Sequence, residues 1–253
     1  MKTPVGERAF PASLCERKWP KALAVTGALG SGKTEWVLNM ALGFRDCGEK
    51  VTVADVDIIN PYFCVRQVAD SLRAEGFRIL TPPESTRWSD MPVMAPEVAW
   101  AVKSPGGRLL VDVGGDAAGG RALKQFSDQM REAGYLLVLV VNPFRPSTMD
   151  TAGVLELVKG IEGISELEVG ALVANPHLMD QTTAEDLLWG YRRVFDAGKA
   201  LGLEVLYGTV SPRLVSQTGA LQKDSPLELW PLVRRMMLPW EEGYMWTRVD
   251  DRS

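Results

Sequence analysis

The chain alternates short, nearly continuous apolar runs with longer amphipathic stretches. The short runs predict buried strands, at 22–26, 51–55, 78–80, 108–113, 135–142, 168–175 and 203–210. The amphipathic stretches predict helices, at 33–45, 64–74, 96–103, 121–132, 148–161, 183–201 and 227–237. Strands that alternate with helices form βαβ units, so we expect an α/β fold with three layers (αβα) around a mainly parallel sheet. Residues 21–253 are expected to form one domain, preceded by an N-terminal tail or edge segment at 1–20.

The most specific motif is the octapeptide GALGSGKT, which begins at Gly27 and ends at Thr34. It matches the Walker A pattern GxxxxGK[ST] and stands between a predicted strand and a predicted helix, which is the context that this pattern requires. Glycines let successive backbone N–H groups turn inward around a phosphate, a lysine neutralises phosphate charge, and a threonine hydroxyl can bind Mg²⁺. The motif therefore predicts a P-loop NTPase that binds a nucleotide through Gly27, Gly30, Ser31, Gly32, Lys33 and Thr34.

Aspartates end two of the other predicted strands. One strand runs into Asp55-Val-Asp57, and another into Asp112-Val-Gly-Gly-Asp116. The carboxyl ends of parallel strands meet at one edge of a sheet, where a bound Mg–nucleotide needs acidic groups for the metal and the attacking water. We take Asp55 and Asp112 as candidate metal-binding residues and Asp57 and Asp112 as candidate catalytic ones. Asp116 is better explained by turn formation next to glycine.

The composition excludes several other chemistries. His177 is the single histidine, and the three cysteines lack metal-binding spacing, so a zinc site, an iron–sulfur cluster or a histidine-based triad is not expected. The cysteines do not indicate a disulfide framework either, and we infer a reducing, cytoplasmic compartment. The net charge of -4 argues against dedicated nucleic-acid binding, and the longest apolar run, 135–141, is too short to be a transmembrane segment.

Together these motifs resemble the SIMIBI class of P-loop NTPases, in particular the MinD/ParA/CobQ-type ATP-binding proteins, over about residues 22–212. The resemblance implies that Asp55 supports the Mg²⁺ hydration shell, that Asp57 orients the attacking water, and that the Gly115 N–H senses the γ-phosphate. It also implies a homodimer, and it makes Asn175, which closes a later strand, the residue that contacts adenine. A guanine-specific NKxD motif is not visible after that strand, so ATP is preferred over GTP.

One position departs from the family pattern. Members with the deviant phosphate loop carry a second lysine directly after the first glycine, and here that residue is Ala28. Transition-state charge would then need another cation, for which Arg66, Arg121 and Arg145 are candidates because each follows a predicted strand.

We therefore expect a slow, Mg²⁺-dependent ATPase that couples its nucleotide state to a conformational change or a partner contact, with Lys33, Asp57 and Asp112 as catalytic residues. The loops at 58–63 and 142–146 are the segments that could respond to the nucleotide. Three alternatives stay open: an ATP-dependent phosphoryl-transfer or ligase-type enzyme acting on a small molecule, a GTPase for metal-centre assembly, and a nucleotide-responsive module that does not hydrolyse its ligand.

Overall fold

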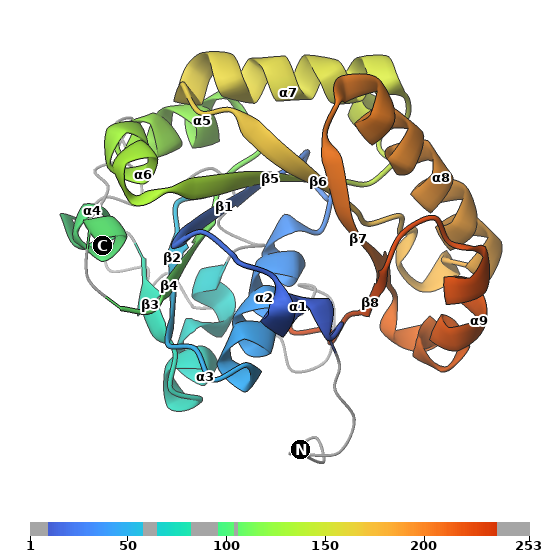
Figure 1. Ribbon diagram of the computed structural model, residues 1–253, viewed down its shortest axis with the longest axis horizontal. Coiled ribbons are helices and arrows are strands. Elements are labelled where there is room, and N and C mark those ends of the chain that lie inside the picture. Colours follow the sequence, from blue (N-terminus) through green and yellow to red (C-terminus); the bar gives the residue numbers. More distant parts are fainter. Residues whose placement is uncertain (1–9, 58–64, 82–95, 104–105, 237–253) are drawn as a thin grey trace, which may run out of the picture.

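A single eight-stranded sheet forms the middle layer of the fold, in the order β3-β2-β4-β1-β5-β6-β7-β8 (Figure 1). The computed structural model describes residues 10–57, 65–81, 96–103 and 106–236. Every pairing between neighbouring strands is parallel. The strands are β1 (Ala22–Thr26), β2 (Val51–Asp55), β3 (Arg78–Leu80), β4 (Arg108–Asp112), β5 (Tyr135–Val141), β6 (Val169–Ala174), β7 (Glu204–Val210) and β8 (Leu229–Pro231).

Helices cover both faces of the sheet and enclose two apolar cores. One face carries α1 (Ser13–Glu16), α2 (Lys33–Asp46) and α3 (Ala69–Ala74). The other carries α4 (Pro96–Lys103), α5 (Ala117–Lys124), α6 (Ser127–Ala133), α7 (Thr151–Ser165), α8 (Ala184–Leu201) and α9 (Thr218–Asp224). A strand buried on both faces is apolar at successive positions, which explains why the continuous runs predicted β1 to β7 within two residues. The three-layer α/β fold is confirmed.

The strand order brings the predicted site residues together. β1 lies in the middle of the sheet between β4 and β5, and β2 pairs with the other side of β4. Asp55 and Asp112, the last residues of β2 and β4, are register partners. The ends of β1, β2 and β4 therefore meet at one edge, which is where ligands bind in open parallel sheets.

The helix predicted at 227–237 is wrong. Its first part is the edge strand β8, and the residues after it up to Met236 have no regular secondary structure. Leu229 packs into the core on one face of the sheet and Trp230 into the core on the other, an alternation that a strand can satisfy and a helix cannot. Pro231 ends β8, as expected for an edge position that needs no N–H donor.

Two other predicted helices are interrupted. The helix expected at 121–132 is two helices, α5 and α6, and α5 begins earlier because Asp116 caps it. Phe126, between them, has a non-helical backbone (φ -130°, ψ 22°) and is buried, so its packing breaks the helix. The one expected at 64–74 begins with a 3-10 turn at Val65–Val68 before α3.

Cys15 and Cys47 form a disulfide, with Cα atoms 5.5 Å apart, which corrects the expectation that no disulfide is present. The bond links α1 to the C-terminal end of α2. Leu14 brings the two helices together by packing over Gly43, where a side chain would collide with it. The cysteine content therefore no longer supports a reducing compartment.

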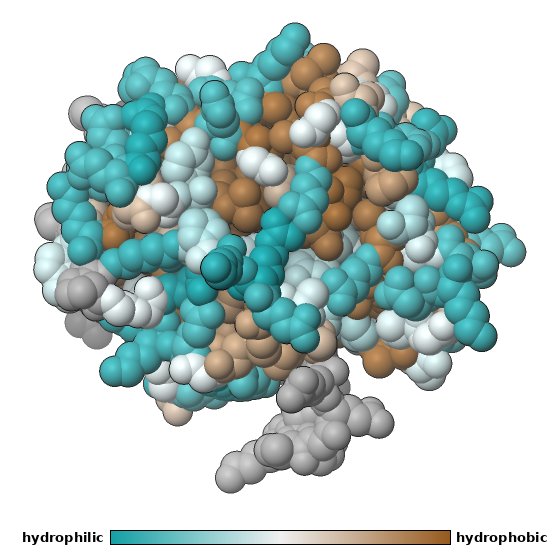
Figure 2. All heavy atoms as spheres, in the orientation of Figure 1, coloured by the Kyte–Doolittle hydropathy of each residue, from teal (hydrophilic) through white to brown (hydrophobic). Residues whose placement is uncertain are grey.

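The surface drawn in Figure 2 is hydrophilic around most of its rim, with hydrophobic residues showing between the polar ones near its centre. Within the described residues, no helix is both long and apolar enough to cross a bilayer.

Candidate functional site

The phosphate-loop motif forms a glycine-rich turn between β1 and α2. Gly30 (φ 73°) and Gly32 (φ 86°) have left-handed backbone conformations, which glycine adopts without strain. The turn leads straight into α2, so Lys33 and Thr34 lie in the first turn of this helix, both buried. Backbone N–H groups at the start of a helix have no partner within it and attract anions.

The Thr34 hydroxyl donates a hydrogen bond to Oδ2 of Asp112, at 2.7 Å. Asp112 is fully buried, and its other oxygen, Oδ1, has no hydrogen-bond partner among the described residues. Burial raises the pKa of Asp112 to about 7, against the opposing effect of the nearby Lys33 charge. A buried carboxylate oxygen without a partner is costly unless a cation or a donor reaches it.

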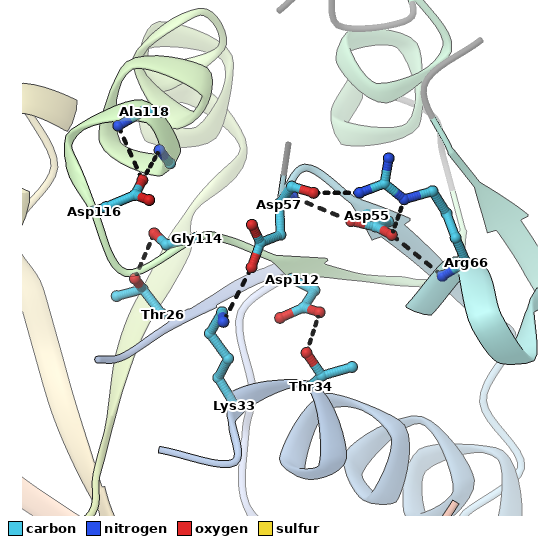
Figure 3. Close-up of polar contacts among 11 residues, drawn as sticks. Thr26, Lys33, Thr34, Asp55, Asp57, Arg66, Asp112, Gly114, Asp116 and Ala118 are labelled. Atoms are coloured by element: carbon cyan, nitrogen blue, oxygen red, sulfur yellow. Dashed lines mark hydrogen bonds and ion pairs between the residues drawn. The ribbon is translucent and has the colours of Figure 1, made fainter. Parts of the chain in front are cut away.

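Lys33 pairs with Asp57 in the middle of the site, where Nζ and Oδ2 are 3.0 Å apart (Figure 3). Both side chains are almost completely buried. Burial lowers the pKa of Lys33, but the charges of Asp112 and Asp57 outweigh it, and the net pKa is above its usual value. The lysine is therefore a fixed positive charge held among carboxylates.

Arg66 contacts Asp55 with both its guanidinium group and its backbone N–H. Its Nε lies 3.0 Å from Oδ2 of Asp55, and its backbone N–H donates to the same oxygen. Oδ1 of Asp55 accepts from the Asp57 N–H at 3.1 Å, and the Arg66 guanidinium also donates to the Asp57 carbonyl. Burial raises the pKa of Asp55 and the Arg66 charge opposes that rise. Arg66 thus fixes the acidic pair instead of facing the phosphate loop.

The segment after β4 packs directly on the phosphate loop. The Thr26 hydroxyl donates to the Gly114 carbonyl at 3.1 Å, and a Cβ on Gly115 would lie 1.9 Å from the Gly27 carbonyl oxygen. Gly115 is therefore required for this close approach. Asp116 accepts from the N–H groups of Ala118 and Gly119 as the N-cap of α5, which agrees with a turn-forming role.

Asn175 supports the phosphate loop from the side of β6. Its Nδ2 donates to the Ser31 carbonyl at 2.6 Å, and its Oδ1 accepts from the Thr209 hydroxyl. Both polar ends of the side chain are used in these contacts. The sequence singled out Asn175 by its place after a strand, but it gave no signal for Thr209, a buried threonine near the end of β7.

Two side chains converge on the Gly30 carbonyl from outside the loop. Arg145 Nε donates to it at 3.0 Å, and His177 Nε2 lies 3.1 Å from the same oxygen. Burial and the adjacent Arg145 charge lower the pKa of His177. Arg145 is thus the candidate cation that lies at the loop, whereas Arg121 is exposed on α5.

The sequence predicted two loops that could respond to the nucleotide, at 58–63 and 142–146. The 58–63 loop lies outside the described residues. In the 142–146 loop, Asn142 donates to the His177 carbonyl at 3.1 Å, and Phe144 stacks on Trp189. This loop is therefore connected to the segment that follows β6.

A cavity of about 630 Å³ opens beside the phosphate loop, a volume typical of small-molecule sites. One wall is formed by the loop and the first turn of α2, and a second by the segments after β6 and β7. A third wall comes from the residues after β8, for which the sequence predicted a helix. Its main lining residues are Leu29, Gly30, Lys33, Glu35, Arg145, Pro176, His177, Met179, Pro212, Arg213, Leu232, Arg234 and Met236.

The donor set at Thr34 and Asp112 fits a magnesium ion that is shared with a phosphate. Mg²⁺ prefers hard oxygen ligands, and with nucleotides it uses one or two protein oxygens together with phosphate oxygens and water. The partnerless Oδ1 of Asp112 is such an oxygen. No three His, Cys, Asp or Glu side chains gather as a metal site of their own within the described ranges.

No protein-family model matches the chain, and no curated protein matches it. Among solved structures it is similar to the cell division protein FtsY of Thermotoga maritima, with a TM-score of 0.55 and 15% identity over 79% of this chain and 63% of that one. It is also similar to FtsY of Mycoplasma mycoides (TM-score 0.53, 16% identity, 76% of this chain, 59% of that one). A third is the signal recognition particle receptor FtsY of Elizabethkingia anophelis in complex with GDP (TM-score 0.51, 20% identity, 75% and 57%).

These likenesses show a shared fold, the three-layer α/β fold of P-loop NTPases. The chain covers 57% to 63% of the length of these three solved structures, which is less than two thirds. They do not single out the MinD/ParA group that the motifs suggested.

Proposed function

We propose that this protein binds a Mg²⁺-bound nucleoside triphosphate, ATP in the first place, and hydrolyses it slowly. Hydrolysis would couple the nucleotide state to a conformational change or to contact with a partner. The partner that we propose first is a second copy of the chain, which would form a homodimer. The contact between Thr34 and Asp112 carries this proposal, because it leaves a buried carboxylate oxygen open beside a phosphate loop.

Phosphate binding follows from the loop and Lys33. The N–H groups of Gly27–Thr34 surround the β- and γ-phosphates, and the positive end of the α2 dipole adds to their attraction. Lys33 leaves Asp57 when a phosphate oxygen becomes its partner. Because both partners are buried, this exchange of one anion for another keeps the lysine charge compensated throughout.

The exchange gives Asp57 its catalytic role. Freed from Lys33, the carboxylate of Asp57 can accept a hydrogen bond from the water that attacks the γ-phosphate. Arg66 and Asp55 hold the Asp57 backbone in place while this happens. Asp55 supports the metal indirectly, since its own oxygens already accept hydrogen bonds.

The Thr34 hydroxyl and Asp112 would hold Mg²⁺ beside the phosphate loop. A bound Mg²⁺ would supply positive charge against the negative charge that develops during phosphoryl transfer. Gly115, packed on Gly27, connects the loop to the segment after β4, so a change at the γ-phosphate can move this segment.

GTP is the second candidate, because one similar structure, the FtsY of Elizabethkingia anophelis, contains GDP. Asn175 does not decide between the bases, since its amide is engaged with Ser31 and Thr209. The choice is therefore left to direct competition between the two nucleotides.

The test measures ATP and GTP binding by calorimetry and phosphate release by the wild type, Lys33→Ala and Asp57→Asn. We expect Lys33→Ala to lose at least about a hundredfold in affinity, and Asp57→Asn to retain binding but lose about a hundredfold in turnover. Lys124→Ala is the control, because this exposed lysine at the end of α5 pairs with Glu166 after α7 and does not line the cavity beside the phosphate loop. A wild type that binds neither nucleotide at micromolar concentration would refute the proposal.

A further inference from the structure

The five residues after β8, 232–236, cross the first turns of α2, and we call them the C-terminal strap. The strap begins where the Leu232 N–H donates to the Val210 carbonyl at 2.9 Å, so it leaves the sheet edge at the end of β7. The sequence did not predict this extended segment, because its apolar and basic residues follow a pattern that is typical of a helix.

Two side chains of α2 hold the strap by its backbone. Asn39 accepts from the Val233 N–H at 2.7 Å and donates to the Val233 carbonyl at 2.9 Å. Glu35 accepts from the N–H groups of Arg235, at 2.5 Å, and Met236, at 3.1 Å. Glu35 and Asn39 are four residues apart and therefore on the same face of α2, directly after Lys33-Thr34. This set of backbone contacts fixes the strap relative to the phosphate loop.

The strap presents its side chains alternately. Leu232, Arg234 and Met236 line the cavity beside the phosphate loop. Arg235 points to the other side, where its guanidinium pairs with Glu75 at the end of α3. The alternation is that of an extended segment, and it places one arginine in the cavity and its neighbour outside.

The location of the strap decides which part of a nucleotide it would meet. The phosphates occupy the turn at Gly27–Thr34, and the cavity continues from there past Glu35 to the strap. The sugar and base have to extend into this remaining space. Here they face the strap on one side and Pro176 and Pro212 on the other.

We propose that the C-terminal strap is the nucleoside-recognition wall of the site, with the Arg234 guanidinium contacting the base or ribose between Leu232 and Met236. This inference rests on the proposed nucleotide binding and adds to it the residues that recognise the nucleoside. Aromatic bases stack on arginine planes and against apolar side chains, and a guanidinium can donate to ribose oxygens as well. None of these contacts requires the phosphates.

The experiment compares Arg234→Ala with Arg235→Ala, a matched control that removes the same side chain from the neighbouring position. Dissociation constants are measured for ATP, for GTP and for inorganic triphosphate, which has the phosphates without a nucleoside. We expect Arg234→Ala to weaken the better-bound nucleotide by about tenfold and to leave triphosphate binding unchanged. Arg235→Ala should bind all three probes like the wild type.

Three results would overturn the strap assignment while nucleotide binding stands: unchanged nucleotide affinity in Arg234→Ala, an equal loss for triphosphate, or an equal loss in Arg235→Ala. A wild type that binds triphosphate but gains no affinity from the nucleoside would overturn it as well. Failure of the wild type to bind any of the three probes would instead refute the proposed function, and the strap assignment with it.

Discussion

The two sides of the phosphate loop are built on different principles. On the side of β2 and β4, charged side chains are buried and paired with one another, as in the ion pair between Lys33 and Asp57. On the side of β6, β7 and the C-terminal strap, the loop borders an open cavity with apolar and basic lining. The first side suits phosphates and a metal, whose charge can replace the internal pairs, and the second suits a nucleoside, which needs contact area and few charges.

The largest effect should come from Asp112→Asn on the charged side. Asparagine can still accept from Thr34, but it brings no negative charge to Mg²⁺, so we expect the gain in nucleotide affinity on adding Mg²⁺ to fall by about a hundredfold. Without Mg²⁺ the variant should bind at least as well as the wild type, because a buried negative charge near the phosphates is gone.

Calorimetric titrations with Mg²⁺ and with EDTA measure both quantities. Asp116→Asn is the control, since Asp116 caps α5 and asparagine caps helices about equally well. If Asp112→Asn keeps the full Mg²⁺ gain, this carboxylate does not serve the metal.

Gly32→Ala is the second test, and it acts where the two sides meet. A Cβ at Gly32 would lie 2.1 Å from Nδ2 of Asn175, and the backbone there has a φ of 86°. The loop and its support must both move, for which we expect about a thirtyfold loss of nucleotide affinity.

Gly48→Ala is the control that distinguishes the effect of backbone strain from that of the collision with Asn175. Gly48 has nearly the same φ, 85°, but a Cβ there meets nothing within 4 Å. Urea unfolding should show that Gly48→Ala loses about 1 kcal/mol of stability and that Gly32→Ala loses more, because the collision with Asn175 adds to the strain, while nucleotide titration should show a loss for Gly32→Ala alone. Equal binding by both variants would contradict the role given to the contact with Asn175.

The same contrast explains how much could be predicted from the sequence. β1 to β7 and the charged side were predictable, because continuous apolar runs, GKT and aspartates at strand ends are local patterns. The partners of those residues were not. That Arg66 would hold Asp55, or that Thr209 would hold Asn175, depends on which strand ends the fold brings together.

The side of the loop formed by β6, β7 and the C-terminal strap was harder to predict from the sequence, because its walls come from segments without a motif. Residues 227–236, which include β8 and the C-terminal strap, are apolar at intervals that fit a helix as well as a strand, and the burial of β8 on both faces of the sheet decides for a strand. The pairing of Cys15 with Cys47 likewise depends on the packing of α1 against α2 and not on cysteine spacing.

Asn175→Ala tests the boundary between the two sides more gently. It leaves the Ser31 carbonyl and the Thr209 hydroxyl without a partner, and we expect about a tenfold loss of nucleotide affinity. If Asn175 only supports the loop, the variant should lose affinity for ATP and for GTP by the same factor. Thr209→Val should then give a smaller loss that is again equal for the two nucleotides. A change in the ratio of the two dissociation constants would show instead that Asn175 contacts the base.

The smallest expected effect on nucleotide affinity is at Glu35, which joins α2 to the C-terminal strap and whose titration is expected to change stability instead. Burial raises the pKa of Glu35 to about 7 from its ordinary value of 4.5, although Arg234 and Arg235 oppose the rise. The folded state then binds a proton that the unfolded chain has lost, so this group makes stability fall as the pH increases from about 4.5 to 7.

Glu35→Gln removes the titration, and its single side-chain oxygen can accept from only one of the two strap N–H groups that the two carboxylate oxygens of Glu35 bind. This loss is the same at every pH, so it does not enter the pH-dependent difference. Urea unfolding of wild type and variant at pH 5 and pH 8 measures the effect as a difference, which cancels the titration of Asp112 and other shared groups. We expect the variant to gain about 2 kcal/mol relative to the wild type between these two pH values. A difference that does not change with pH would mean that Glu35 stays ionised under the strap. The strap would then be held by a charged carboxylate throughout, and the open side of the site would depend on buried charge as much as the side formed by β2 and β4.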